Sequence, residues 1–97
     1  MTEEERLVAV QQNGYAIQYI KNPSEAVQLA AVRENSWVIR CIKNPSEAIQ
    51  LAAVQRNNWA IAHIENPSKF LLFYVFSNEK NPDLKEYCLN KMLPLGK

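Results

Sequence analysis

Cys41 and His63 are the side chains of this chain best suited to chemistry, and they lie 22 residues apart. A thiolate and an imidazole can bind a metal ion together, or act as nucleophile and base. Metal sites usually have three or four ligands and enzymes need a convergent set of groups, whereas only Tyr19 shares the register of this pair. We therefore expect no catalytic residues, no metal site and no cofactor.

Two further sets of residues could recognise a ligand. Aromatic residues recur at Tyr15, Trp37 and Trp59, where they could stack on bases or anchor a partner. Packing into the core is favoured, because this column begins an inner periodic face. Four basic residues gather in and near the middle of the chain: Arg33, Arg40, Lys43 and Arg56. A solvated surface is favoured over a nucleic-acid interface, because 11 basic residues face 10 acidic ones overall.

A tandem repeat determines where all these residues lie. The segment KNPSEAVQLAAV at 21–32 recurs as KNPSEAIQLAAV at 43–54, and an Asn-Pro-Ser triplet at 22, 44 and 66 gives a period of 22 residues. A fixed period of this length predicts stacked supersecondary units. We expect a single domain over 1–97, with repeats at about 2–21, 22–43 and 44–65 and a C-terminal cap at 66–97.

Capping residues predict where the first helix of each unit begins and ends. Asn22, Pro23 and Glu25 suit an N-cap, the first helical position and a capping box. Asn35, matched by Asn13 and Asn57, is typical of a left-handed residue after a helix. The repeated asparagines at 13, 35, 57 and at 22, 44, 66 could instead form a polar ladder for a ligand. Capping is the favoured explanation for them.

The second segment of each unit has two interpretations. It reads YAIQYI at 15–20, WVIRCI at 37–42 and WAIAHI at 59–64, and its β-branched and aromatic content would suit the strand of a leucine-rich repeat. The residues that stay apolar are spaced by three and four, as in Ile17 and Ile20. This spacing favours a second short helix, so that each unit becomes a pair of helices of about ten residues.

The two ends of the chain differ from the internal units. Thr2 and Glu5 form a capping-box pattern for an N-terminal cap, and Asn81-Pro82 predicts a last helix with one apolar face: Leu84, Tyr87, Cys88 and Met92. Between them, the run from 70 to 76 is apolar throughout. The large side chains of this run are Phe70, Phe73, Tyr74 and Phe76. We expect them to contact the last helix, or a second copy of the chain in a homodimer.

Over residues 2–68 the pattern resembles the short α-helical solenoid repeats of phage and bacterial proteins of unknown function, and more distantly the leucine-rich-variant repeats. The resemblance implies a binding scaffold. With the periodicity, it predicts an all-α class, a short α-solenoid of about three helix-pair repeats with an N-terminal cap and a divergent C-terminal helical cap.

The sequence therefore predicts a non-enzymatic scaffold that occludes a protein partner. The resemblance to phage proteins implies one example, a phage-encoded inhibitor of a host defence system such as an anti-CRISPR. The expected contacts are mostly positions that differ between units: Gln18, Tyr19, Arg33, Arg40, Lys43, Arg56 and His63. Nucleic-acid binding through Trp37, Trp59 and the four basic residues is the alternative. The first residues, MTEEER, lack the pattern of a signal peptide and no apolar run could span a bilayer, so a cytoplasmic location without membrane contact is expected.

Overall fold

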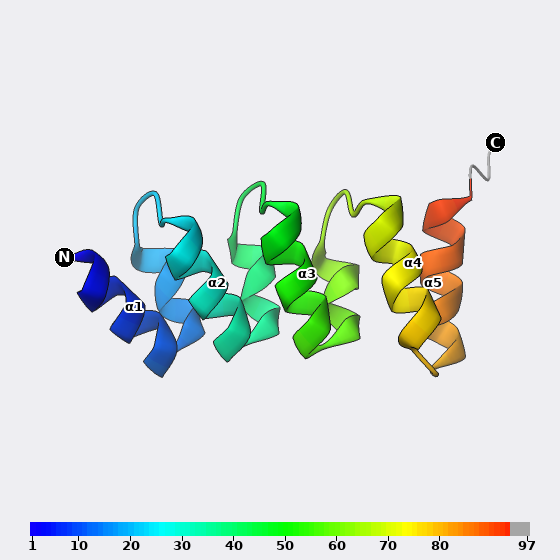
Figure 1. The fold of residues 1–97 in the computed structure, drawn as a ribbon, viewed down its shortest axis with the longest axis horizontal. Helices are drawn as coiled ribbons and strands as arrows, with labels where there is room; N and C mark the ends of the chain where they lie inside the picture. Colours follow the sequence, from blue (N-terminus) through cyan, green and yellow to red (C-terminus); the bar gives the residue numbers. More distant parts are fainter. Residues whose placement is uncertain (94–97) are drawn as a thin grey trace.

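Each 22-residue unit folds into one α-helix followed by one short 3-10 helix, and the units stack side by side in a row (Figure 1). The computed structural model describes residues 1–93 of the chain. The repeated elements are α1 (Glu3–Gln12), η1 (Gly14–Tyr19), α2 (Glu25–Glu34), η2 (Ser36–Cys41), α3 (Glu47–Arg56) and η3 (Asn58–His63). Two antiparallel helices complete the row, α4 (Lys69–Asn78) and α5 (Pro82–Met92).

The predicted all-α class is confirmed, because residues 1–93 contain helices and no strand. The overall shape is elongated, with principal dimensions of 47 × 25 × 16 Å. Such a shape is that of a short helical solenoid. The last four residues of the cap predicted at 66–97 lie outside the described part of the chain.

The second segment of each unit is a 3-10 helix of six residues, so the prediction of a second short helix in place of a strand is confirmed, and the expected length of about ten residues is wrong. A 3-10 helix has three residues per turn and aligns positions i and i+3. Ile17 is 3% exposed and Ile20 is 9% exposed, and the same spacing of three holds for Ile61 and Ile64. The repeated spacing of three thus joins a buried residue of the 3-10 helix, Ile17 or Ile61, to the residue that ends it, Ile20 or Ile64.

The capping roles also differ from those predicted. Ser24, Ser46 and Ser68 are the N-caps of α2, α3 and α4, so these helices begin three residues after each repeated asparagine. Asn13, Asn35 and Asn57 have extended backbones, with φ of −157°, −153° and −157°. Each instead caps the following 3-10 helix, because its side-chain oxygen accepts a hydrogen bond from the amide two residues later at 3.0 Å. A side chain that caps the next helix removes the need for a left-handed end.

Small residues and a hydrogen-bond ladder join successive units. Ala31 and Ala53 are fully buried at the seams between α-helices, where small side chains allow a close approach. Along the start of the helices, the hydroxyl of each N-cap serine donates to a glutamate of the preceding unit: Ser24 to Glu3, Ser46 to Glu25 and Ser68 to Glu47. Each serine therefore caps its own helix and links it to its neighbour.

At the first seam the backbones come still closer. The Gly14 amide donates to Glu34 Oε1 at 2.6 Å, and a Cβ on Gly14 would lie 2.8 Å from the carbonyl oxygen of Ala31. Only glycine fits this seam without a shift of the neighbouring backbone.

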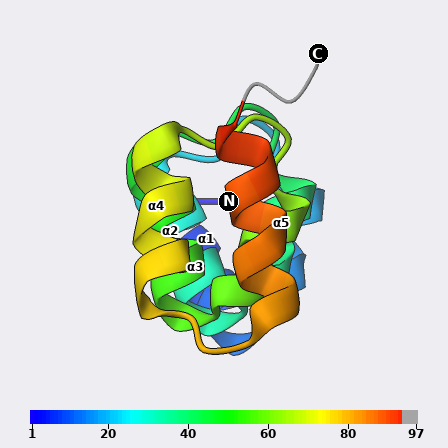
Figure 2. The same ribbon diagram turned by 90° about the vertical axis from the view of Figure 1, so that its right-hand side faces the viewer.

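The row has two layers, and α5 completes the second one. Figure 2 shows the α-helices α1 to α4 on one side, with α5 on the side of the 3-10 helices. The predicted caps at both ends are confirmed: Thr2 and Glu5 form a capping box, and Asn81 with Pro82 begins α5. Leu84 and Cys88 of α5 are fully buried, and Tyr87 and Met92 pack against the same core. The apolar face predicted for this helix is thus the face it buries.

Candidate binding groove

Two open hollows follow each other along one edge of the row, which we call the loop edge because the chain loops there from each 3-10 helix to the next α-helix. The hollow between the first two units has a volume of about 520 Å³ and the one between the second and third units about 660 Å³. Equivalent residues line both, since Gln18, Asn22 and Lys43 of the first hollow correspond to Arg40, Asn44 and Glu65 of the second. Together they form one groove that repeats with the 22-residue period.

The loops that shape this groove have an unusual backbone. Asn22 and Asn44 have φ values of 51° and 53°, in the left-handed region that asparagine tolerates better than most residues. Each is followed by a proline, whose carbonyl oxygen accepts a hydrogen bond from a glutamine of the next helix. Gln28 Nε2 donates to Pro23 O at 3.0 Å, and Gln50 Nε2 donates to Pro45 O at 2.9 Å. These bonds hold the loop and the glutamine amide in one arrangement.

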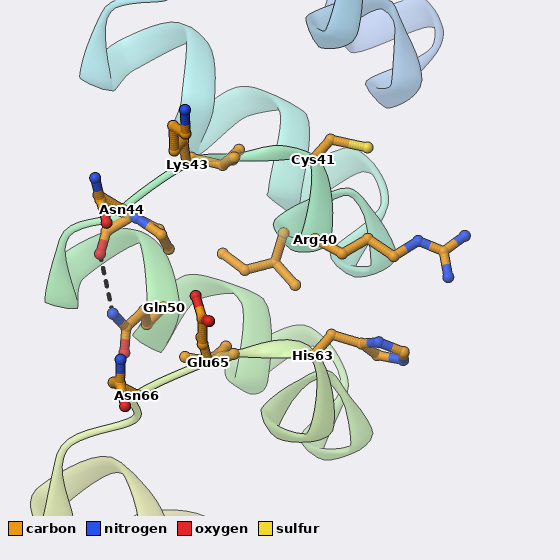
Figure 3. A pocket seen from close by; sticks show the side chains of 12 residues that line it. Arg40, Cys41, Lys43, Asn44, Gln50, His63, Glu65 and Asn66 are labelled. Atoms are coloured by element: carbon orange, nitrogen blue, oxygen red, sulfur yellow. Dashed lines mark hydrogen bonds between the residues drawn. The ribbon is translucent and has the colours of Figure 1, made fainter.

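The groove has two walls of different chemistry, which Figure 3 shows for the second hollow. Arg40, Cys41 and His63 extend in parallel toward one side. Asn44, Gln50 and Asn66 lie on the other side, and the Glu65 side chain reaches between the walls. One wall therefore varies in residue type from unit to unit, and the other consists of repeated amides.

Five of the seven predicted partner-binding residues lie at or next to this groove. Gln18, Arg40, Lys43 and His63 line the hollows, and Lys43 lines both of them. Tyr19 ends η1 at the position equivalent to Cys41, and 85% of its surface is exposed. An aromatic side chain this exposed contributes little to the core and is available to a partner.

The basic residues do not form one patch. Arg33 and Arg56 lie in the last turns of α2 and α3, at the edge opposite the loops. Arg56 lines a separate hollow of about 490 Å³ there, together with Glu34 and Trp37. The cluster that the sequence suggested is divided between two edges of the molecule, with an acidic side chain at the second.

The aromatic column is only partly a core element, although core packing was the favoured prediction. Tyr15 packs against the core, while Trp59 is 40% exposed. The column also carries contacts between units. Arg40 Nη2 donates to the Tyr15 hydroxyl at 3.4 Å, and the Trp37 and His63 rings meet edge to face with centroids 4.8 Å apart. These contacts orient two of the groove's variable side chains.

Neither cysteine belongs to a metal site in the described structure. Cys41 is exposed beside the groove, and within residues 1–93 no three potential metal ligands gather. Cys88 lies in the core of the C-terminal helices, where burial raises the pKa of its thiol and the Glu79 carboxylate raises it further. A thiol that is buried and kept protonated is a poor nucleophile.

The apolar run from 70 to 76 divides into a packed and an exposed part. Leu71, Leu72 and Val75 are buried beside α5, and Tyr74 and Phe76 pack against this core, with Lys85 Nζ 4.3 Å from the Phe76 ring centroid. Phe70 and Phe73 remain about 60% exposed, at 62% and 61%. The last helix therefore covers part of the run and leaves two large aromatic side chains in water.

Sequence reasoning set aside the residues of the amide wall. It assigned Asn22, Asn44 and Asn66 to helix caps, a role that the serines two positions later perform. The serine of each triplet could have indicated the true N-cap, because Ser is as good an N-cap as Asn and stands after the proline in every triplet.

Comparisons with protein-family models, with curated proteins and with solved structures found no match for this chain. None of the helices in residues 1–93 has both the length and the apolar character needed to cross a membrane.

Proposed function

We propose that this chain is a non-enzymatic binding protein that captures a segment of a protein partner along the loop edge. The observation that carries the proposal is the groove itself, in which two hollows of similar size repeat in register with the units. Adjoining hollows that recur with the repeat suit a long ligand better than a small molecule, which usually occupies a single enclosed pocket.

The wall of variable residues supports a specific partner. Equivalent positions there hold Gln18 and Arg40, or Cys41 and His63, although the neighbouring segments at 21–32 and 43–54 differ at a single position. Residues that pack between units must match from one unit to the next, whereas residues that face a partner are free to differ. Tyr19, exposed next to this wall, adds the kind of large aromatic surface that anchors protein interfaces.

Binding of this kind acts by occlusion, because the bound segment is covered and no bond of the partner is made or broken. A phage-encoded inhibitor of a host defence system, such as an anti-CRISPR, is one setting in which occlusion alone would be sufficient. That setting is suggested by the resemblance of the repeat alone.

The repeat supplies unusually mild variants for a test. Arg40→Ala places at the second unit the residue that the third unit has at Ala62, and Lys43→Glu places there the equivalent of Glu65. Arg33→Gln, at the opposite edge, likewise copies Gln11 and Gln55 and serves as the control. All three variants should fold, because each residue already occurs at that position of this fold.

The experiment is capture of partners from a bacterial lysate on the immobilised 97-residue chain, followed by affinity measurement with the purified partner. The double variant R40A/K43E should weaken binding by roughly tenfold or more, as loss of a central contact does, and R33Q should leave it unchanged. Equal loss in both variants, or in neither, would rule out the loop edge. Capture of nucleic acid instead, with affinity that falls steeply as salt rises, would support the alternative function.

A further inference from the structure

Three asparagines recur at the loop edge, and no single structural role accounts for all of them. Asn22, Asn44 and Asn66 cap no helix, are exposed, and make no side-chain hydrogen bond to other residues within 1–93. A left-handed backbone would explain an asparagine at 22 and 44, although glycine adopts it at lower cost. It does not explain Asn66, whose φ is not positive. What the three positions share is the amide group.

Two glutamines present further amides to the same groove. The Nε2 groups of Gln28 and Gln50 are held by Pro23 O and Pro45 O, and both side chains are partly buried. Their Oε1 atoms accept no hydrogen bond from the rest of residues 1–93. An amide fixed through one atom is pre-organised to bind through the others, because its rotamer entropy is already lost.

We infer that five side-chain amides of the groove bind the main chain of an extended peptide segment. We call these residues the amide ladder: Asn22, Gln28, Asn44, Gln50 and Asn66. The inference rests on the proposed function and specifies its ligand. A carboxamide carries both a donor and an acceptor, the same pair that a peptide group offers, so each amide can pair with one peptide group of the ligand. The groove also has charges of both signs, at Lys43 and Glu65, which favours a peptide over an anionic ligand.

The spacing of the ladder favours one peptide conformation. Packed helices lie about 8 to 10 Å apart, so equivalent amides recur at about that distance. A polyproline II helix rises about 3.1 Å per residue with three residues per turn, so the same side of the ligand recurs every 9 Å or so. Its N–H and C=O groups make no bonds within the helix and are open to the ladder. Every third peptide group of the ligand then meets one unit.

The test uses linear peptides of about 12 residues with random sequence, a length that spans about 37 Å in the polyproline II conformation. A displayed library is selected on the intact chain, and the selected peptides are measured against variants that keep the fold. Gln28→Leu and Gln50→Leu copy Leu72, which this fold accepts at the equivalent position. Asn22→Gly and Asn44→Gly keep the left-handed backbone and remove only the amide. Gln55→Ala, exposed on α3, is the control.

We expect the four-site variant to bind the selected peptides at least tenfold more weakly and Gln55→Ala to bind them normally. N-methylation of single peptide bonds should weaken binding at every third position, and the side-chain NH₂ signals of the ladder residues should shift in NMR spectra when peptide is added. Failure to select any linear peptide, or equal binding to the four-site variant, would overturn the inference.

The two proposals can fail separately. A protein partner that is lost on R40A/K43E but binds the four-site variant normally would leave the proposed function intact and exclude the amide ladder. The opposite result is that peptide binding requires the amide ladder, while no partner from the lysate loses affinity on R40A/K43E. This result would support the ladder and exclude a binding role for the wall of variable residues.

Discussion

The seam between α2 and α3 and the seam between α3 and α4 begin alike and then diverge. Both start with a serine that donates to a glutamate of the preceding unit, Ser46 to Glu25 and Ser68 to Glu47. Farther along, Ala52 and Ala53 allow α3 to lie close to α2, whereas Tyr74 and Val75 occupy those positions in α4. The backbone of α4 approaches α3 over a shorter stretch as a result.

The difference shows how this repeat array ends. Larger residues at the seam separate the last α-helix from the row, and an α-helix then replaces the short 3-10 helix of the second layer. In this layer α5 buries Leu84 and Cys88, as η2 buries Val38 and Ile39. Small residues at the seams thus allow the units to repeat, and large residues at the last seam end the row.

The largest expected effect is that of removing α5. A chain that ends at Lys80 loses the burial of Leu84 and exposes the face of α4 that α5 covers, at about 1.5 to 3 kcal/mol per large apolar side chain, so the free energy of unfolding should fall by about 3 kcal/mol or more. Urea denaturation of this chain and of one ending at Leu93 measures the difference. Sedimentation of both detects self-association of α4 through its newly exposed side chains. A truncated monomer of unchanged stability would show that α5 is not needed to end the row.

A smaller effect should come from enlarging one alanine at the internal seam. Ala53→Leu must force extra methylenes between close helices and should destabilise the chain by about 1 to 3 kcal/mol. Val75→Leu, at the equivalent position of the wider seam, should cost less. Ala48→Leu is the control, because Ala48 is exposed and substitutions there should stay within about 0.5 kcal/mol. Similar losses for Ala53→Leu and Val75→Leu would mean that the two seams are equally tight.

The helical class, the unit length and the two end caps could be predicted from sequence because each depends on local signals. The triplet Asn-Pro-Ser gives the period, Thr2 with Glu5 gives the first cap, and Asn81-Pro82 gives the last helix. The type of the second helix was harder to predict, because Ile17 and Ile20 at a spacing of three suit either kind of helix. Two features favour a 3-10 helix of six residues: the cap at Asn13, and the short segment in which the chain must run back to the next α-helix.

The groove could not be predicted from the sequence, because it does not depend on local signals. It depends on which side of the row each loop faces, and the basic residues illustrate this well. Arg33 and Arg40 are seven positions apart in sequence, yet one ends an α-helix at one edge and the other points out from the groove wall. Stacking of the units brings together residues that are far apart in the sequence. The repeat implies that such contacts exist, but it does not indicate on which face of the row each residue lies.

The serine ladder should contribute about equally at both seams, since its geometry is shared. Ser46→Ala removes the cap of Ile49 N and the bond to Glu25, and should cost about 1 kcal/mol. Ser68→Ala should cost a similar amount, and Glu25→Ala separates the link between units from the cap. Ser77→Ala, exposed in the last turn of α4, is the control for urea denaturation. A much larger loss at Ser68 would indicate that the wider seam depends on its remaining polar links.

The smallest expected effect concerns pH and the far end of the wider seam. There the Asn81 amide donates to Glu79 at 2.9 Å and Asn58 Nδ2 donates to it at 3.0 Å, and these bonds hold the pKa of the Glu79 carboxyl below its usual value of 4.5. A carboxyl whose pKa is lower in the folded chain stabilises it above the unfolded pKa, and this contribution is lost as pH falls through the folded pKa. The unfolding free energy of the natural chain should therefore exceed that of Glu79→Gln at pH 6, and the gap should shrink as pH falls below 4.5.

Subtracting the two pH profiles removes the contribution of the other carboxylates, which both proteins share. Because Glu79 lies near the surface, the gap should be small and should decrease with salt. Asn58→Ala should reduce it further, since Asn58 ties η3 to the turn before α5. A gap that persists unchanged to pH 3 would mean that the Glu79 charge does not hold the C-terminal helices to the row, and that large side chains alone define this end.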